Sequence, residues 1–331
     1  MKSLLVALFV VALTVAATMT PAYADPLSGE VLKFSQLPLN NGLPPTAGGA
    51  PYPGHDEWST AYLTPQPTAY QGSFMADDFS DTANTSVYHV SWWGSYDQNQ
   101  TFNGVQKFLI SFESDLPFDP NLGASRPDQV LSSEVVSLGA LAPGSGTFTE
   151  KLVNGNVPEH LYQYNAELKL PFAEQANQIY WLKIVALVDP ATEGNINWGW
   201  HDRDWSLKNT LASPVPTPGE NVIGTVVDPN GLPQPVWHFQ DDAVSGRILM
   251  TPNTAGNGYN IQQAGYQPQN YVFIPGAVPI DGPFGIQNFS KDLAFQLYTR
   301  VPEPSTYLMA AMGSMGLALA AWKHRRAKRS P

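Results

Sequence analysis

The densest group of chemically versatile side chains is the segment NWGWHDRDW (197–205), in which Trp198, Trp200 and Trp205 lie beside a histidine, an arginine and two aspartates. Flat aromatic faces flanked by hydrogen-bonding groups are what sugar rings stack against, so these tryptophans are candidates for carbohydrate binding. The alternative is structural, because Trp198 and Trp200 are two residues apart and share one face if the segment is a strand. The sequence favours the core for these two residues.

Two pairs of adjacent aspartates could supply oxygen ligands for a structural Ca²⁺ ion: Asp77 with Asp78, and Asp241 with Asp242. Carboxylates and loop carbonyls are the ligands that this hard cation prefers. Adjacent aspartates also cap turns or stay solvated, and this is the simpler interpretation. His55, Asp56 and Glu57 have the residue types of a metal site, but consecutive residues rarely converge on one ion. We expect no cofactor, and a structural calcium ion stays open as the alternative.

Common catalytic motifs are missing from the chain, which has no H-E-x-x-H, no G-x-S-x-G, no Walker loop and no G-x-G-x-x-G. A glycosidase needs only two carboxylates about 5–9.5 Å apart, and one sequence does not reveal that distance. A polysaccharide hydrolase therefore stays open as an alternative. We expect a protein that is not an enzyme.

The composition indicates a folded, β-rich body. Of the 331 residues, 43% are hydrophobic and 11% aromatic, which is enough apolar material for a core. The 30 prolines and 27 glycines disfavour helices and fill turns. The absence of cysteine excludes disulfides, thiolate metal sites and a cysteine nucleophile.

Charge is distributed unevenly along the chain. Six of the 17 basic residues lie at the two ends, so the segment between Lys2 and Lys323 carries 11 basic and 28 acidic residues, a net charge of −17. Such a surface repels phosphates, and we expect no nucleic acid partner.

The N-terminus has the features of a secretory signal peptide. Lys2 precedes an apolar run, and Ala22 and Ala24 occupy the two positions that signal peptidase requires. We predict that residues 1–24 are a signal peptide that is removed during export.

The C-terminus combines three features in order: the tripeptide Pro302, Glu303 and Pro304, an apolar stretch Tyr307–Trp322, and a basic end. The apolar stretch predicts a transmembrane helix of about 24 Å, slightly shorter than the hydrocarbon layer. The positive-inside preference would hold the basic residues in the cytoplasm: Lys323, Arg325, Arg326, Lys328 and Arg329. The prolines keep the helix from extending backwards, so the tripeptide is presented outside the membrane.

This C-terminal segment (301–331) resembles the PEP-CTERM sorting signal of Gram-negative bacteria. In that family an exosortase removes the signal, and the proteins are typically exported in strains that make exopolysaccharide or biofilm. The resemblance implies transient anchoring in the inner membrane and a mature product near 25–304 at the cell surface or outside the cell.

Four segments between the two signals have strong strand patterns. VYHVSWW (87–93) is β-branched and aromatic, while VQKFLISF (105–112) and DLAFQLYT (292–299) alternate apolar and polar residues. QIYWLKIVALV (178–188) is apolar on both faces except at Lys183, which is typical of a central strand that is covered on both sides. Weaker patterns predict strands in GTFTEKLV, YNAELKL, ENVIGTVV, QPVWHF and GRILM.

About nine or ten short strands without a long amphipathic helix predict an all-β body with a β-sandwich or jelly-roll architecture and long Pro/Gly-rich loops. We expect one domain over residues 25–300. The stretch 211–220 is rich in proline and could instead be an internal linker between two domains.

The body also resembles exported bacterial β-domains of unknown function that often carry this kind of sorting tail. The segments that carry the resemblance are, in order, ADDF (76–79), WWGSY (92–96), YWLKIVA (180–186), WGWHDR (198–203), DDA (241–243) and DLAFQLYT (292–299). This resemblance implies a shared architecture but no known reaction.

We therefore expect an exported, non-enzymatic component of the cell surface or extracellular matrix, with a structural or adhesive role. Signal peptidase and an exosortase are its expected partners, and the membrane is a transient one. The alternatives are a module that binds exopolysaccharide and a hydrolase that acts on it.

Overall fold

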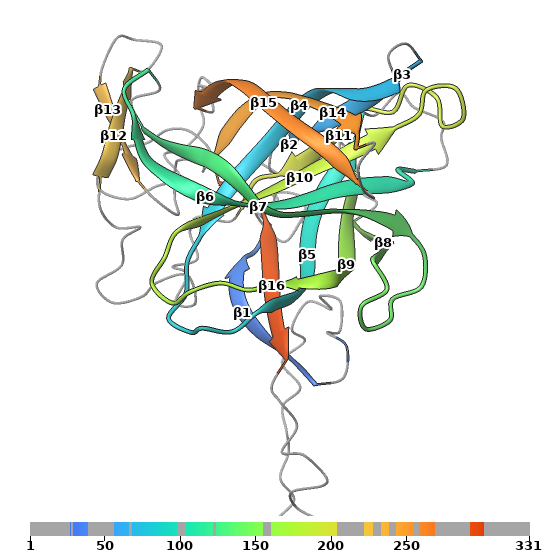
Figure 1. Cartoon of the computed structure of the whole chain (residues 1–331), viewed down its shortest axis with the longest axis horizontal. Coiled ribbons are helices and arrows are strands. Elements are labelled where there is room, and N and C mark those ends of the chain that lie inside the picture. The colour runs from blue at the N-terminus through green and yellow to red at the C-terminus, as the bar shows by residue number, and fades with distance from the viewer. Residues whose placement is uncertain are drawn as a thin grey trace, which may run out of the picture.

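The computed structural model describes residues 27, 29–38, 56–65, 68–97, 104–121, 124–154, 160–203, 222–227, 233–237, 243–253, 258–268 and 292–300. They form β-strands joined by turns and loops (Figure 1). The strands are β1 (Glu30–Gln36), β2 (Asp56–Trp58), β3 (Thr60–Pro65), β4 (Thr68–Phe79), β5 (Val87–Tyr96), β6 (Lys107–Asp119), β7 (Ala124–Leu138), β8 (Thr147–Asn154), β9 (Leu161–Phe172), β10 (Tyr180–Val188), β11 (Trp198–His201), β12 (Val222–Val227), β13 (Pro233–Trp237), β14 (Val244–Pro252), β15 (Tyr259–Pro268) and β16 (Phe295–Arg300). The all-β prediction is confirmed.

Fourteen of these strands form one mixed sheet, and β12 and β13 form a separate hairpin. The main path of the sheet runs β1-β16-β5-β9-β8-β7-β6-β10-β3-β4-β14-β15, with β11 and β2 attached beside β5. Most neighbours are antiparallel, but β3 is parallel to β10 and β8 is parallel to β7.

The long sheet folds back on itself, so that strands far apart in its order face each other. Phe79 of β4 contacts Phe295 of β16, and Phe108 of β6 contacts Trp92 of β5, each pair edge to face. These contacts define a main core between an outer layer (β1, β16, β5, β9) and a central layer (β4, β6, β10). The predicted sandwich is therefore present, with a single continuous sheet supplying both facing layers.

A second core covers the other face of the central layer. It gathers apolar side chains of β4, β6 and β10 under the β14–β15 hairpin, which Figure 1 shows crossing over β4. Strand β10 is consequently buried at all nine positions. Tyr180, Leu182 and Ile184 enter the main core, while Trp181 and Val185 enter the second core. The prediction of a central strand covered on both sides is confirmed.

Several predicted features fall on other parts of the chain. None of the described residues forms a helix that is long and apolar enough to cross a membrane. The predicted signal peptide (1–24), the linker (211–220) and the transmembrane helix (307–322) lie outside the described residues.

Candidate functional site

Trp198 and Trp200 lie in the main core. Both are on β11, which pairs with β5 and β2, and both side chains are completely buried. The Trp198 indole donates a hydrogen bond to the Tyr164 hydroxyl (3.1 Å), and the Trp200 indole donates to the carbonyl of Ala294 (2.9 Å). A platform for sugar rings needs an exposed aromatic face, so these two residues do not provide one. Trp205 lies outside the described residues.

Asp77 and Asp78 do not converge on a common ion. Both are buried on β4, where consecutive side chains point to opposite faces of the sheet. Asp77 accepts hydrogen bonds from the backbone amides of Leu293 (2.7 Å) and Asp78 (2.9 Å), so its carboxylate fixes the chain just before β16. These positions do not allow Asp77 and Asp78 to act together as ligands of one calcium ion, the option that the sequence left open. Asp241 and Asp242 lie outside the described residues.

The Asp56 carboxylate also has a structural environment. It accepts a hydrogen bond from the Ser95 hydroxyl, and the His201 ring nitrogen Nδ1 lies 2.9 Å from its other oxygen. In a serine hydrolase the histidine lies between the serine and the aspartate. Here the aspartate lies between the other two residues, so this arrangement does not activate Ser95 as a nucleophile.

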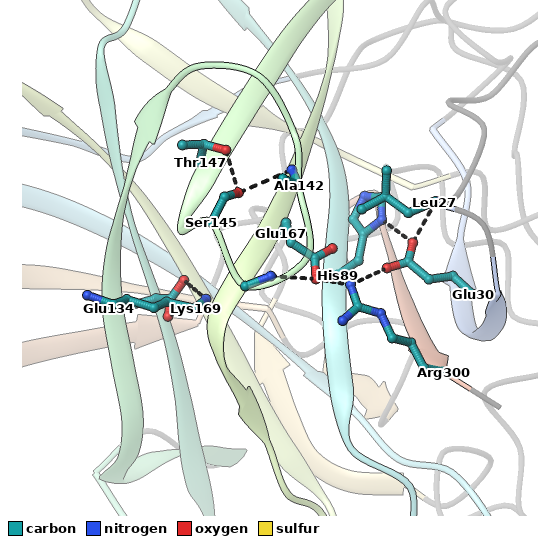
Figure 2. Close-up of polar contacts among 11 residues, drawn as sticks. Leu27, Glu30, His89, Glu134, Ala142, Ser145, Thr147, Glu167, Lys169 and Arg300 are labelled. Atoms are coloured by element: carbon teal, nitrogen blue, oxygen red, sulfur yellow. Dashed lines mark hydrogen bonds and ion pairs between the residues drawn. The ribbon is translucent and has the colours of Figure 1, made fainter. Parts of the chain in front are cut away.

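The structure brings together a different group of ionisable residues, which we call the Glu–His–Glu–Arg cluster: Glu30, His89, Glu167 and Arg300. They come from β1, β5, β9 and β16, four neighbouring strands of the outer layer. Figure 2 shows the two carboxylates, the imidazole and the guanidinium converging. The side chains of Glu30 and Glu167 are completely buried, and that of His89 is 1% exposed.

Strand register explains why these side chains meet. Glu30 lies opposite Arg300, and His89 lies opposite Glu167. The two pairs of strands are adjacent, because β16 pairs with β5. Neighbours of these residues such as Val90 point into the main core, so strand alternation places His89 and Glu167 on the opposite face of the outer layer.

Hydrogen bonds fix each member of the cluster. His89 Nδ1 lies 2.8 Å from Glu30 Oε2, and that oxygen also accepts the backbone amide of Leu27 at 2.8 Å. The Arg300 guanidinium donates to Glu30 Oε1 (3.2 Å) and to Glu167 Oε1. The backbone amide of Gly144 donates to the same Glu167 oxygen at 3.3 Å.

The two carboxyl groups differ in acidity. Burial and the nearby negative charge of Glu30 raise the pKa of Glu167 to about 7. Burial also works against ionisation of Glu30, but the hydrogen bond and charge of His89, with the Leu27 amide, outweigh it and lower the pKa of Glu30. Near neutral pH, Glu30 is therefore ionised while Glu167 holds a proton in part of the molecules.

Such a split between two close carboxyl groups is also found in retaining glycosidases, in which one is the acid and the other the nucleophile. In this cluster Arg300 bridges the two carboxylates, and neither carboxylate is exposed. A sugar would have to displace the guanidinium to reach them. The cluster can hold a proton or a metal ion, because one ligand atom from each of Glu30, His89 and Glu167 lies within 4.8 Å of the others.

Two further groups of buried ionisable side chains lie elsewhere in the body. Lys183 interrupts the apolar strand β10 and lies 2.5 Å from Glu113 of β6, where both side chains are completely buried. Lys33 of β1 contacts Asp81 and Glu174, which belong to two loops beside the outer layer.

The described body and its tail define the chain as an exported all-β protein that is sorted by an exosortase. The PEP-CTERM protein-sorting motif matches residues 300–326 and includes Pro302, Glu303 and Pro304. Residues 32–242 match a family described as a domain of unknown function (DUF7901), and the chain belongs to this family. Both resemblances seen in the sequence are thereby confirmed. No curated protein and no solved structure matches the chain.

Proposed function

We propose that the body is a non-enzymatic structural or adhesive component, which exosortase processing delivers to the cell surface or the extracellular matrix. The sorting motif identifies the export route, which uses an exosortase. The burial of the ionisable groups in the body supports a structural or adhesive role. The proposal rests on one observation: the buried carboxylates form ion pairs with other side chains of the body. The carboxylates of Glu30, Glu167 and Glu113 are buried and are paired with Arg300 or Lys183 of the same fold.

A matrix experiment in the host tests this role. Deletion of the gene is expected to weaken the cohesion of the matrix, and the wild-type chain is expected to restore it. A Pro304→Ala variant tests the route, because disruption of the sorting motif should leave full-length protein in the inner membrane fraction.

The alternative of a hydrolase is tested by a second experiment, which measures the release of oligosaccharides. A hydrolase would release oligosaccharides from the host exopolysaccharide, and replacing either Glu30 or Glu167 with glutamine would abolish that release in a folded protein. We expect no release from the wild-type chain. Turnover that depends on either glutamate would refute the non-enzymatic role.

A second candidate function is binding of exopolysaccharide in a groove at one end of the central layer. The groove, with a volume of about 690 Å³, is lined by hydrogen-bonding side chains of Ser114, Asp115 and Gln178 and by Leu131 and Leu170. Leu170 is 71% exposed, so an apolar contact is available beside the polar groups. This combination is typical of sites for polar ligands with one apolar face.

Titration with host exopolysaccharide distinguishes this candidate from a purely structural role. Leu170→Asp should abolish binding if the groove is used. The matched control is Leu152→Asp, because Leu152 is 49% exposed and does not line the groove. Equal binding by both variants would exclude the groove.

A further inference from the structure

We propose that Glu30, His89 and Glu167 form a binding site for one divalent transition-metal ion, with Zn²⁺ as the best-suited ion. Carboxylate oxygens and imidazole nitrogens are both ligand types that zinc takes in proteins. The proposal goes beyond the structural role of the body and does not depend on it.

The three ligand residues are held in place by the sheet. His89 and Glu167 are register partners on adjacent strands, and Glu30 reaches the same point from β1 across β16. Their ligand atoms lie within 4.8 Å of one another, and His89 Nδ1 is already 2.8 Å from Glu30 Oε2. In a tetrahedral zinc site, metal–ligand bonds of about 2.1 Å place ligand atoms about 3.4 Å apart. Binding of an ion would therefore require His89 Nδ1 and Glu30 Oε2 to move apart from 2.8 Å, and the Glu167 carboxylate to lie about 3.4 Å from both.

One buried carboxylate oxygen of the cluster could still accept a hydrogen bond or bind a cation. Glu167 Oε2 is completely buried, and no hydrogen bond reaches it from the described residues. Its partner atom Oε1 accepts from Arg300 and from the Gly144 amide. In the ionised form of Glu167, a buried carboxylate oxygen without a donor is costly, and coordination of a cation removes that cost.

The donor types select among metal ions. Ca²⁺ and Mg²⁺ prefer oxygen ligands alone, whereas an imidazole nitrogen favours Zn²⁺ and similar ions. The surroundings of His89 also fit this role. If Nδ1 binds the metal, Nε2 carries the proton and faces the Ser91 hydroxyl at 3.5 Å. Ser91 donates in turn to Asn165 (2.5 Å), so a polar chain orients the imidazole from behind.

Arg300 is compatible with a metal at this site. It contacts Glu30 and Glu167 through their Oε1 atoms, whereas His89 lies beside the other oxygen of Glu30. Three protein ligands leave a coordination position for a bidentate carboxylate or a water molecule. Arg300 and the metal neutralise the same two carboxylates. Each should therefore stabilise the body more strongly when the other is absent.

Metal titration of the full-length chain in mild detergent tests the proposal. After treatment with a chelator, the protein is titrated with ZnCl₂ by calorimetry, and the bound metal is counted by mass spectrometry. We expect one Zn²⁺ per chain and a higher melting temperature, since an ion that binds only the native state stabilises it. His89→Gln and Glu167→Asp should each weaken binding roughly tenfold or more. Circular dichroism establishes that the variants are folded.

Two further variants test alternative explanations. The first alternative is zinc binding at surface histidines, and the second is a salt-bridge cluster that binds no metal. His160→Gln removes an exposed histidine and should leave zinc binding unchanged. Arg300→Met should lower the melting temperature of the metal-free protein, and Zn²⁺ should raise that temperature more than in the wild type. A purely structural salt bridge would not show this rescue.

Three results would overturn the proposal. The first is the absence of Zn²⁺ binding to the folded wild-type chain. The second is binding that survives both His89→Gln and Glu167→Asp, and the third is binding that His160→Gln abolishes. Failure of the matrix experiment would leave these results unaffected, so the two proposals are tested separately.

Discussion

The ion pair between Lys183 and Glu113 gives the sharpest test of how the central layer is stabilised. Lys183 Nζ lies 2.5 Å from Glu113 Oε1, and neither side chain is exposed. Glu113 also accepts hydrogen bonds from Ser111 (3.0 Å) and from the Gln263 amide of β15 (2.7 Å). The pair therefore connects β10 and β6 to the hairpin that covers the second core. Lys183→Met keeps most of the buried volume but removes the positive charge.

The expected loss is large because Glu113 would remain as an uncompensated buried charge. Breaking a buried pair on one side costs about 3–5 kcal/mol in the free energy of unfolding. At about 2–4 °C per kcal/mol for a body of this size, the melting temperature should fall by about 6–20 °C. Removing both charges in Lys183→Met with Glu113→Gln should restore most of the loss, because the glutamine still accepts from Ser111.

Urea denaturation of the wild type, both single variants and the double variant measures these terms as a double-mutant cycle. Arg126→Met is the control, because the Arg126–Asp119 pair is partly exposed and its removal should cost about 1 kcal/mol or less. If the losses of the two single variants simply add in the double variant, the two charges do not stabilise each other and the reasoning is refuted.

Two further perturbations test the outer layer and the main core. Burial, which outweighs the hydrogen bond and charge of Lys33, raises the pKa of Glu174 from 4.5 to about 8. The native state therefore holds this proton more tightly than the unfolded state, and the associated stability is complete below about pH 4.5 and is lost as the pH rises towards about 8. Between these limits the wild type should lose stability relative to Glu174→Gln, by up to several kcal/mol at about 1.4 kcal/mol per pKa unit. A difference that does not change with pH in paired urea melts would contradict this assignment. In Gly94→Ala, the new methyl group would overlap the Gly199 carbonyl and the Trp198 indole, so thermal melting should reveal a loss of about 1–3 kcal/mol. An unchanged melting temperature would mean that Trp198 does not pack directly on β5.

Periodicity predicted the strands whose two faces differ clearly or are both apolar. Phe108, Ile110 and Phe112 alternate on β6 and share the main core, and Leu293, Phe295 and Leu297 do the same near β16. The weaker patterns also correspond to strands: β8, β9, β12, β13 and β14. In β8, β9 and β14, local alternation is sufficient because some side chains of each strand are buried while others are exposed.

Other strands were missed because tertiary contacts, rather than local patterns, define them. Strand β7 spans Ala124–Leu138 with many polar residues, and β15 spans Tyr259–Pro268 with four glutamines and asparagines in ten residues. Both pair with an apolar neighbour and expose much of their own surface, so their sequences resemble loops.

The Glu–His–Glu–Arg cluster could not be derived from the sequence, because its members lie on four strands that are brought together by register. A weak signal exists in single residues. His89 lies between Tyr88 and Val90 in an apolar strand, and Glu167 lies between Ala166 and Leu168. A charged or titratable residue inside an apolar strand costs energy unless it has a partner, so such residues point to buried networks. The Trp198 and Trp200 side chains were correctly favoured as core residues.

The pairing of Glu30 with Arg300 has a consequence for export. Five residues separate the predicted signal cleavage from β1, and only Val301 separates β16 from Pro302. The two ends of the folded body therefore leave it at the same place. If the predicted membrane helix begins at Tyr307, a fully extended chain from Arg300 covers only about 20–25 Å, and the body would fold close to the membrane surface. Strand β16 lies between β1 and β5, and the outer layer stays open until this last strand has been translocated. Completion of the fold and arrival of the sorting motif outside the membrane would then be consecutive events, and we expect processing to follow the folding of the body.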